Sequence, residues 1–326
     1  MEEEIDGVKV LKICRKDAGC PGLRFFHPKW TRLNDALRKA DADVYYHNCG
    51  ECVTGQIALW CQKHRKPFVF SSASEGDCEY PHRGLSSQRE QMLFCYGIRR
   101  AKVRVVQTQK QKRMLEENLG LSSIHIPMPC QELSIPPALR NAAPSNRVVW
   151  VGRIWIEKRP EMFLDLAEAC PSLHFDLVGP GFNAEDYGHS FSDDVFSRAR
   201  RISNVTVHGA LTREQVFCLY DEAACLCCTS EYEGFPNTFL EAWSRGVPVV
   251  STFDPDNTIV SRNLGAFARN AAELKLGLLS VLGKDETYKE ISSNALRYFA
   301  EHHTVDAVLP RFAEVFSESV CSAIAQ

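Results

Sequence analysis

The residues best suited to chemistry lie in the segment Cys228–Ser251, which reads CTSEYEGFPNTFLEAWSRGVPVVS. Two glutamates in it, Glu233 and Glu241, stand eight positions apart. Glu233 lies in a Gly/Pro loop, and Glu241 lies one turn into a helix that the sequence predicts to begin near Pro236 and Asn237. Because the first N–H groups of a helix bind anions, a carboxylate beside them suggests a sugar–phosphate ligand. The alternative is an ordinary strand–loop–helix with two solvated acids.

Two cations follow an earlier strand, which the sequence predicts at Arg147–Gly152. Arg153 comes directly after this strand and Lys158 five residues later. Arginine offers a fork of donors and lysine a point charge, so together they could hold a diphosphate from two sides. The alternative is a pair of solvated surface cations. Their position favours the diphosphate interpretation, since this loop and the Glu233 loop end strands of one predicted sheet.

Small residues end two further strands of the same predicted sheet. Gly179–Gly181 lacks side-chain bulk and would allow a ligand to approach, although a plain tight turn is an equal alternative. Gly209, Ala210 and Leu211 could contact a nucleotide base through their backbone. For His208 itself, a structural role is favoured over that of a catalytic base.

Apolar strands alternate with segments of helix length throughout the chain, a pattern typical of parallel α/β layers. In the first half we predict strands at 8–13, 43–47, 68–71, 103–107 and 124–127, and helices at 29–40, 55–64, 86–100 and 109–118. In the second half we predict strands at 147–152, 174–178, 204–208, 224–229 and 247–251, and helices beginning at Pro160, after Thr212 and at Val305. Thr212 and Gln215 form a candidate capping box.

This alternation predicts two doubly wound, Rossmann-like domains that face a cleft. The expected boundaries are 1–130 for an acceptor-side domain, 131–146 for a linker, 147–303 for a donor-binding domain and 304–326 for a helix that packs back on the first domain. Ligands of such sheets bind beyond the carboxyl ends of the strands. The acidic start runs directly into the strand at Val8 without a Gly-rich turn, so we expect either that the first domain lacks one strand–helix unit or that the chain has lost its natural beginning.

Composition limits the function classes. The chain has 326 residues, of which 44% are hydrophobic and 24% are charged, as in soluble globular proteins. A net charge of −3 predicts no general affinity for nucleic acid. The start lacks the features of a signal peptide, and no apolar run has the length of a membrane span, so we expect a cytoplasmic protein.

Fourteen cysteines are expected to be reduced thiols in such a protein. Cys225, Cys227 and Cys228 lie in an apolar strand and are interpreted as small core residues. Cys49 and Cys52 form a Cys-x-x-Cys pair in a predicted loop, and no second pair stands at zinc-ribbon spacing from it. Loop cysteines without a role are favoured over a zinc or redox pair, and we expect no bound metal.

From Arg147 onward the chain resembles the retaining glycosyltransferases of family 4, the "glycosyl transferases group 1", which have the two-domain GT-B fold. The stretches that carry this resemblance are VGRIWIEKRPE (151–161), DLVGPG (176–181), NVTVHGALTREQVFCLYDEA (204–223) and SEYEGFPNTFLEAWSRGVPVVS (230–251). The last contains the family's Glu-x7-Glu element as Glu233 and Glu241. Residues 36–50 and 101–115 resemble the family's first domain more loosely.

The resemblance implies transfer of a sugar from a nucleotide-diphosphate sugar to an acceptor, with retention at the anomeric carbon and without a cofactor. It implies that Arg153, Lys158 and Glu233 are catalytic, with Glu233 on the sugar and Glu241 on the nucleotide ribose. The remaining donor-binding residues that it implies are Gly152, Gly179, Gly209, Ala210, Leu211, Gly234, Phe235, Pro236, Asn237 and Thr238. Several of these would offer backbone amides, although Pro236 has no N–H to give.

The chain also departs from the family. The usual first strand and its Gly-rich loop are absent, and residues 252–265 lack the double-Gly turn common there. A truncated homologue that binds nucleotide sugar without transferring it is therefore the main alternative. A nucleotide-sugar epimerase or a phosphorylase of the same fold is a weaker one.

The acceptor side is less specified, and the acceptor could be a glycan, a lipid-linked or a small molecule. His47 and Asn48, with Ser74 and Glu75, follow two strands, and His47 or Glu75 could accept the acceptor's proton. Arg83–Arg113 contains nine Lys/Arg and one acid. Such a segment could contact an anionic membrane surface, or it could be a solvated helix face.

Overall fold

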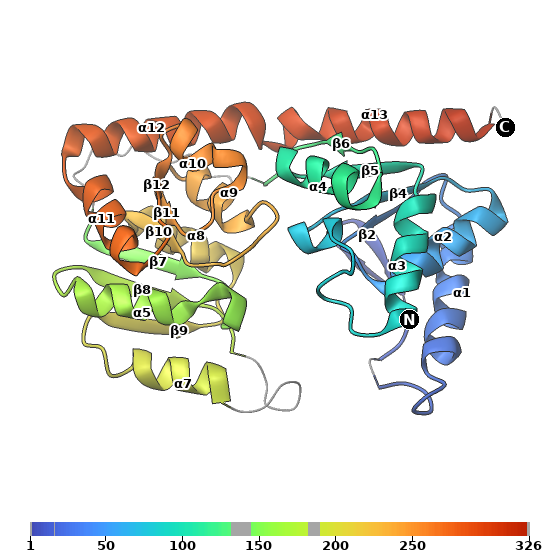
Figure 1. Cartoon of the computed structure of the whole chain (residues 1–326), viewed down its shortest axis with the longest axis horizontal. Coiled ribbons are helices and arrows are strands. Elements are labelled where there is room, and N and C mark those ends of the chain that lie inside the picture. Colours follow the sequence, from blue (N-terminus) through green and yellow to red (C-terminus); the bar gives the residue numbers. More distant parts are fainter. Residues whose placement is uncertain (1, 16, 132–144, 182–189, 325–326) are drawn as a thin grey trace. The chain divides into compact units, whose positions relative to one another are not determined.

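The computed structural model describes residues 2–15, 17–131, 145–181 and 190–324 (Figure 1). The chain divides into two compact units. Unit 1 comprises Met1–Val106, Met114–Ile124 and Ala313–Gln326, and unit 2 comprises Gln107–Arg113 and His125–Phe312. Two helices, α4 (Gln109–Leu119) and α13 (Val305–Ile324), therefore have residues in both units.

Unit 1 contains a four-stranded sheet in the order β3-β4-β5-β6, in which β3, β4 and β5 pair in parallel. Its strands are β3 (Tyr45–Asn48), β4 (Phe68–Ser71), β5 (Val103–Val106) and β6 (Ile124–His125). Its helices are α1 (Thr31–Ala40), α2 (Cys52–His64) and α3 (Gln88–Arg100), with a π-helical segment η1 (Phe25–Trp30) and a 3-10 turn η2 (Glu75–Cys78). The described strands follow one another in a single direction across this sheet.

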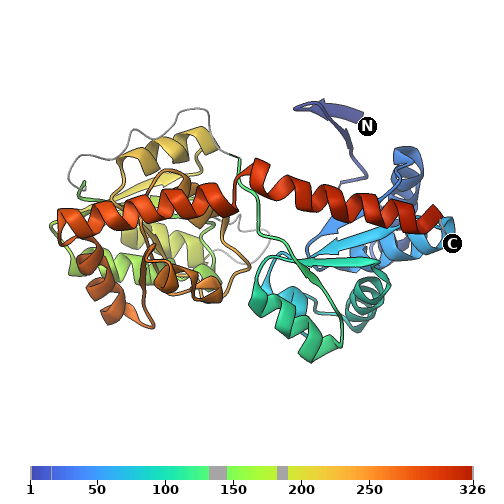
Figure 2. The same ribbon diagram turned by 90° about the horizontal axis from the view of Figure 1, so that it is seen from above.

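The strand predicted at residues 8–13 does not belong to this parallel sheet. It is β2 (Val8–Leu11), and it pairs antiparallel with β1 (Glu2–Ile5) in a separate hairpin. Figure 2 shows the hairpin as a two-stranded ribbon near the N-terminus. Asp6 and Gly7 form its turn, both with positive φ, as a two-residue hairpin turn requires. The placement of this strand in the parallel layers was therefore wrong, and the Asp-Gly dipeptide is the signal that predicts the turn.

Unit 2 contains a six-stranded sheet in the order β12-β11-β10-β7-β8-β9, with all its neighbouring strands parallel. The strands are β7 (Arg147–Val151), β8 (His174–Val178), β9 (Val205–Gly209), β10 (Cys225–Cys228), β11 (Val249–Ser251) and β12 (Gly265–Phe267). The chain moves outward from β7 to β9, returns to β10 and moves out the other way. The sheet is thus doubly wound, and its switch point lies between β7 and β10.

Helices cover both faces of this sheet. They are α5 (Pro160–Ala169), α7 (Ser190–Ala199), α8 (Arg213–Glu222), α9 (Asn237–Ser244), α10 (Thr258–Ser261), α11 (Ala271–Leu282) and α12 (Asp285–His302), with 3-10 turns η3 (Ile156–Lys158) and η4 (Pro255–Asn257). Pro160 occupies the first turn of α5, where its missing N–H costs nothing. The Thr212–Gln215 capping box is confirmed at α8.

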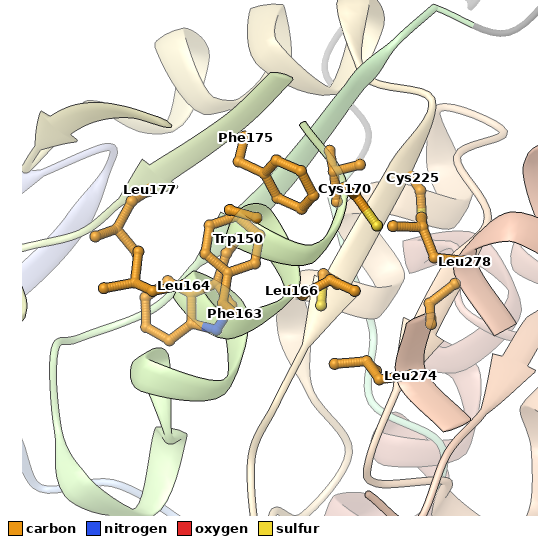
Figure 3. Packing of buried hydrophobic residues seen from close by; sticks show 14 of the residues in the cluster. Trp150, Phe163, Leu164, Leu166, Cys170, Phe175, Leu177, Cys225, Leu274 and Leu278 are labelled. Carbon is orange, nitrogen blue, oxygen red and sulfur yellow. The ribbon is translucent and has the colours of Figure 1, made fainter. Parts of the chain in front are cut away.

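Successive residues of β7 enter different cores, because side chains alternate across a strand. Val148 and Trp150 pack with α5 and α11, whereas Val149 packs with α8, α9 and α12. Figure 3 shows the first core, in which the ring of Phe163 lies between those of Trp150 and Phe175. The ring centroids are 6.4 Å and 5.3 Å from that of Phe163. The loops at the ends of these strands therefore extend from closely packed cores.

The three cysteines of β10 are buried, which confirms their interpretation as core residues. Cys225, Cys227 and Cys228 are free thiols. Burial raises the pKa of Cys225 to about 12 and also raises the pKa of its two neighbours. These thiols remain protonated near neutral pH and behave as small apolar side chains.

Glycines end three adjacent strands and bring their backbones close together. The Gly152 N–H donates to Val178, and the Gly179 N–H donates to Gly209 at 2.8 Å. At Gly179, where φ is +144°, an added Cβ would lie 1.7 Å from the Gly152 carbonyl oxygen. Gly179 therefore has to be glycine for the first two strand ends to meet. Gly209 also has a positive φ of +68°, but open space surrounds it.

A buried carboxylate ties the same three strands together at Asp176 on β8. The guanidinium of Arg147 donates to both its oxygens, at 2.8 and 3.1 Å. His208 on β9 lies 2.7 Å from it through Nε2, and the ring of His174 lies 3.5 Å away. His208 is thus a partner of a buried acid, which agrees with its predicted structural role.

We expect Asp176→Asn to lower the free energy of unfolding by about 3 kcal/mol, because it leaves the partly buried Arg147 without its counter-charge. Chemical denaturation monitored by circular dichroism measures this. Glu222→Gln is the control, since exposed Glu222 lies 3.9 Å from the same guanidinium and should change stability by less than about 1 kcal/mol. Equal effects of the two variants would contradict the assignment.

We expect Gly179→Ala to destabilise the protein by more than about 3 kcal/mol, because steric overlap with Gly152 adds to backbone strain. Gly209→Ala is the matched comparison, with a positive φ but no overlap, and should cost about 1–2 kcal/mol. Thermal and chemical unfolding of both variants measures the difference. A Gly179→Ala protein as stable as Gly209→Ala would show that the contact does not hold the strand ends.

Candidate active site

The loops after β7 and β10 adjoin, because these strands are neighbours at the switch point of the sheet. The first carries Gly152, Arg153 and Lys158, and the second carries Glu233. Parallel α/β sheets bind ligands beyond the carboxyl ends of strands at such a point. The structure therefore gathers in unit 2 the four residues that the sequence singled out from separate loops.

Lys158 and Glu233 contact each other directly. The Lys158 ammonium donates a hydrogen bond to Glu233 Oε1, in an ion pair. The two side chains remain 30% and 16% exposed, so a ligand can reach both. Arg153 is exposed and forms no ion pair with the part of the chain that the structure describes. This end of the sheet thus presents one paired and one solvated cation.

Arg159 fastens these loops together, and the sequence interpretation missed it. Its guanidinium donates to the carbonyls of Thr229 and Ser230, at 2.7 and 3.1 Å, and to the hydroxyl of Thr252 at 2.8 Å. The Thr229 hydroxyl in turn donates to the Lys158 carbonyl at 2.6 Å. Arg159 itself has a φ of +46°. The sequence signal that could have pointed to Arg159 is its position between Lys158 and Pro160, directly before α5.

The loop before α9 offers backbone donors, as predicted, but not at every position. The N–H of Phe235 donates to Gln107 Oε1 at 3.0 Å, so it is already used. The N–H groups of Gly234, Asn237 and Thr238 form no hydrogen bond within the described residues. Pro236 stands at the N-cap of α9. The first turn of this helix therefore keeps donors for an anion.

Glu241 lies in α9, facing Arg213 of α8. Its Oε1 is 3.4 Å from Arg213 Nε, and the side chain is 16% exposed. Burial raises the pKa of Glu241, while Arg213 and the Tyr220 hydroxyl act in the opposite direction. A half-buried carboxylate of this kind can accept hydrogen bonds from ligand hydroxyls.

The other predicted donor contacts follow β9. Ala210 is exposed and Leu211 is half-buried against the core beneath α8 and α9. Gly209 accepts the Gly179 N–H, which aligns this edge with the end of β8. Backbone and methyl groups at this position can contact a flat base without a charged partner.

In unit 1, His47 and Asn48 lie on β3, and Ser74 and Glu75 follow β4. Burial lowers the pKa of His47, whose Nδ1 lies 3.3 Å from the Thr54 hydroxyl. A neutral imidazole of this kind can accept a proton. His47 and Asn48, expected in a loop, are thus the last residues of β3, and together with the segment after β4 they carry groups suited to a hydroxyl-bearing substrate.

One buried acid holds both of these loops, and the sequence interpretation missed it. Asp77 accepts the N–H groups of Gly50, Ala73 and Ser74, at 3.0, 2.6 and 3.1 Å. Its Oδ1 also lies 2.9 Å from His82 Nε2. Because His82 Nδ1 accepts the Gly84 N–H, Nε2 carries the proton and donates to Asp77. The pair is structural.

The basic segment Arg83–Arg113 does not form one continuous face. Arg83 pairs with Glu79, Arg89 lies over the ring of Phe25, and Arg104 donates to a backbone carbonyl. The segment begins before α3 and ends in α4, whose first residues belong to unit 2. Among the described helices, none is long and apolar enough to cross a bilayer.

The Cys49-x-x-Cys52 pair contains two free thiols. Burial raises the pKa of Cys49 to about 11 and also raises the pKa of Cys52. Metal ligands and redox thiols usually need a lowered pKa. Across residues 2–15, 17–131, 145–181 and 190–324, no group of three or more His, Cys, Asp or Glu side chains is arranged to hold a metal.

Comparison with known proteins gives matches at two levels. Residues 145–282 match the family model "Glycosyl transferases group 1". Sucrose-phosphate synthase from Thermosynechococcus elongatus superposes with a TM-score of 0.78 at 16% identity, over 98% of this chain and 85% of that chain. HepE of Anabaena, solved in complex with UDP and glucose, gives 0.73 at 17% identity, over 91% and 83%. HepE in complex with UDP-glucose gives 0.73 at 16%, over 91% and 84%.

No curated protein matches the sequence significantly. At these low identities the structural matches establish the fold, and the family match covers most of unit 2 from β7 to α11. The chain therefore has the GT-B fold, with two α/β Rossmann-like units, and its residues 145–282 match the glycosyl transferases group 1.

Proposed function

We propose that this protein is a glycosyltransferase that moves a sugar from a nucleotide-diphosphate sugar to an acceptor, with retention of anomeric configuration and without a bound metal. The observation that carries the proposal is the Lys158–Glu233 ion pair at the switch point of the unit 2 sheet. In this pair a cation that can bind phosphate lies beside a carboxylate that can accept hydrogen bonds from a sugar, and the loop of Glu233 leads into the N–H donors of α9. A sugar diphosphate needs these three kinds of contact together.

Each donor contact follows from the chemistry of its residue. Lys158 and Arg153 bind the diphosphate, and the N–H groups of Gly234 and Thr238 add neutral donors. Glu233 accepts hydrogen bonds from sugar hydroxyls, and Glu241 accepts them from the ribose.

The reaction breaks the bond between the anomeric carbon and the diphosphate oxygen, whose electrons remain on the departing diphosphate. Lys158 and Arg153 stabilise the charge that grows there, and this stabilisation is the main catalytic effect that we propose. The acceptor oxygen forms the new bond on the same face of the sugar and loses its proton. His47 or Glu75 of unit 1 is the proposed proton acceptor, with Asn48 and Ser74 as acceptor contacts.

The choice of the first donor to test comes from the matched structures, since HepE was solved with UDP and glucose and with UDP-glucose. The acceptor is proposed to be a glycan, a lipid-linked or a small molecule. If it is lipid-linked, cations of Arg83–Arg113 such as Arg99 and Arg100, exposed at the end of α3, could contact an anionic membrane surface.

Thermal-shift measurements with UDP-, GDP- and ADP-glucose test donor binding. A ligand at 100 times its Kd should add about 2.7 kcal/mol of apparent stability, because it binds only the folded protein. Hydrolysis of the bound donor, with water as acceptor, then tests turnover without knowledge of the natural acceptor.

We expect Lys158→Met to lower the rate of donor cleavage by about 10²–10³-fold, with a smaller effect on affinity, because the cation acts on the leaving diphosphate. Lys289→Ala, which removes an exposed cation on α12, is the control and should change neither value. If no nucleotide sugar shifts the stability, the proposal fails. Donor binding without hydrolysis or transfer to any acceptor would instead identify a non-catalytic nucleotide-sugar-binding protein.

Donor affinity should also depend on pH through Glu241. The ribose donates to the carboxylate form, so affinity should fall as acid protonates Glu241. Because burial raises the pKa of this group, the fall should begin at a higher pH than for an exposed glutamate. Calorimetric titration with a nucleotide sugar between pH 8 and pH 4.5 measures this dependence. Glu241→Gln should bind more weakly and show a flat profile; an unchanged acid decline would assign the titration to another group.

A further inference from the structure

We infer that Gln107 is a positioning residue for the donor loop 233–236, an inference that rests on the proposed function of that loop. Gln107 follows β5 in the sequence and belongs to unit 2. Its side chain is buried, and its Oε1 accepts the N–H of Phe235 at 3.0 Å. Phe235 lies 128 positions further along the chain. This hydrogen bond fixes the peptide between Gly234 and Phe235, next to Glu233.

Gln107 is held through its backbone as well as its side chain. Its backbone N–H donates to Gln111 Oε1 at 2.8 Å, and its side-chain amide nitrogen lies 3.6 Å from Met128 Sδ. Its backbone carbonyl oxygen lies 3.0 Å from His125 Nε2. A carbonyl only accepts, so His125 carries its proton on Nε2, and its Nδ1 accepts from Gln109 at 2.9 Å. This consistent set of donors and acceptors leaves Oε1 directed at Phe235.

The donor loop depends on this contact because, among the residues that the structure describes, few other hydrogen bonds reach its backbone. No side chain caps α9, whose N-cap residue is Pro236. The ring of Phe235 packs against those of His303 and Trp243, with centroids 4.9 and 6.1 Å away. These ring contacts hold the side chain, whereas Gln107 holds the peptide plane. The two peptide planes on either side of Gly234 share its Cα, so fixing the plane between Gly234 and Phe235 limits where the N–H of Gly234 and the carboxylate of Glu233 can point.

A second set of hydrogen bonds connects residues 107–110 to the loop after β11. Asp256 accepts the N–H groups of Gln109 and Lys110, at 2.6 and 2.8 Å, at the start of α4. The segment 107–110 is therefore anchored to the strand ends of unit 2 at two points. From here α4 continues into unit 1.

The test compares Gln107→Met, which keeps the length of the side chain but removes the acceptor, with Gln107→Glu, which keeps an acceptor oxygen. Gln109→Met is the matched control, since exposed Gln109 contacts His125 and not the donor loop through its side chain. The first readout is hydrogen exchange of the Phe235 amide without any added ligand. The second readout is the effect of each variant on donor KM and, separately, on kcat.

We expect Gln107→Met to accelerate exchange of the Phe235 amide by about 5- to 100-fold, since a buried N–H loses its partner. Exchange at Leu226 in β10 should not change, which would exclude global unfolding. Donor KM should rise about tenfold with a smaller fall in kcat, whereas Gln107→Glu should restore most of the affinity and the Gln109→Met variant should match the parent protein.

Unchanged exchange at Phe235 in Gln107→Met, or equal effects of Gln107→Met and Gln109→Met, would overturn the inference. If Gln107→Met does not fold, Gln107→Glu still decides, because loss of Phe235 protection despite a retained acceptor would contradict it. The exchange readout needs no nucleotide sugar. A parent protein that binds no donor would therefore reject the proposed function while leaving the exchange result interpretable.

Discussion

The guanidinium of Arg159 is the group on which the arrangement of loops at the carboxyl end of the unit 2 sheet depends. It joins the loops after β7, β10 and β11 through two carbonyls and one hydroxyl. Without it, the three loops would lose the hydrogen bonds that join them to one another, and fixing each loop separately would cost conformational entropy. The Lys158–Glu233 pair lies next to this junction because Lys158 precedes Arg159 directly. The geometry of the candidate site thus follows from a residue that need not touch a ligand.

Much of the fold was predictable from the sequence because most elements carry a local signal. The bounds of β4 and β8 agree with the predicted 68–71 and 174–178, and α13 begins at the predicted Val305. Strong alternation of apolar strands with capped helices explains this agreement. The failure at β2 has a different cause: an apolar strand looks the same whether its partner is parallel or antiparallel. Only the Asp6–Gly7 turn distinguishes the two cases.

The residues of the candidate site also differ in whether the local sequence predicts them. Gly179, Lys158 and Glu233 could be singled out from the sequence because each lies in a loop that follows a strand and has a residue type suited to a ligand contact. Gln107 and Asp77 were not, since each acts through hydrogen bonds to backbone groups whose positions depend on the tertiary structure. Glutamine and aspartate are common in exposed loops, so residue type alone gives no reason to expect a buried one. Long-range polar contacts of this kind leave almost no trace in local sequence.

The thiols of β10 have a practical consequence. Cys225, Cys227 and Cys228 lie inside the sheet and are protonated near neutral pH, so alkylating reagents cannot reach them while the strand is paired. Exposed Cys218 lies in α8, the helix that precedes β10, and can serve as an internal reference in the same unit. Alkylation of these native cysteines thus measures local opening of β10, the strand that leads into the donor loop. The rate at which the three thiols of β10 are alkylated would report how often β10 separates from its neighbouring strands.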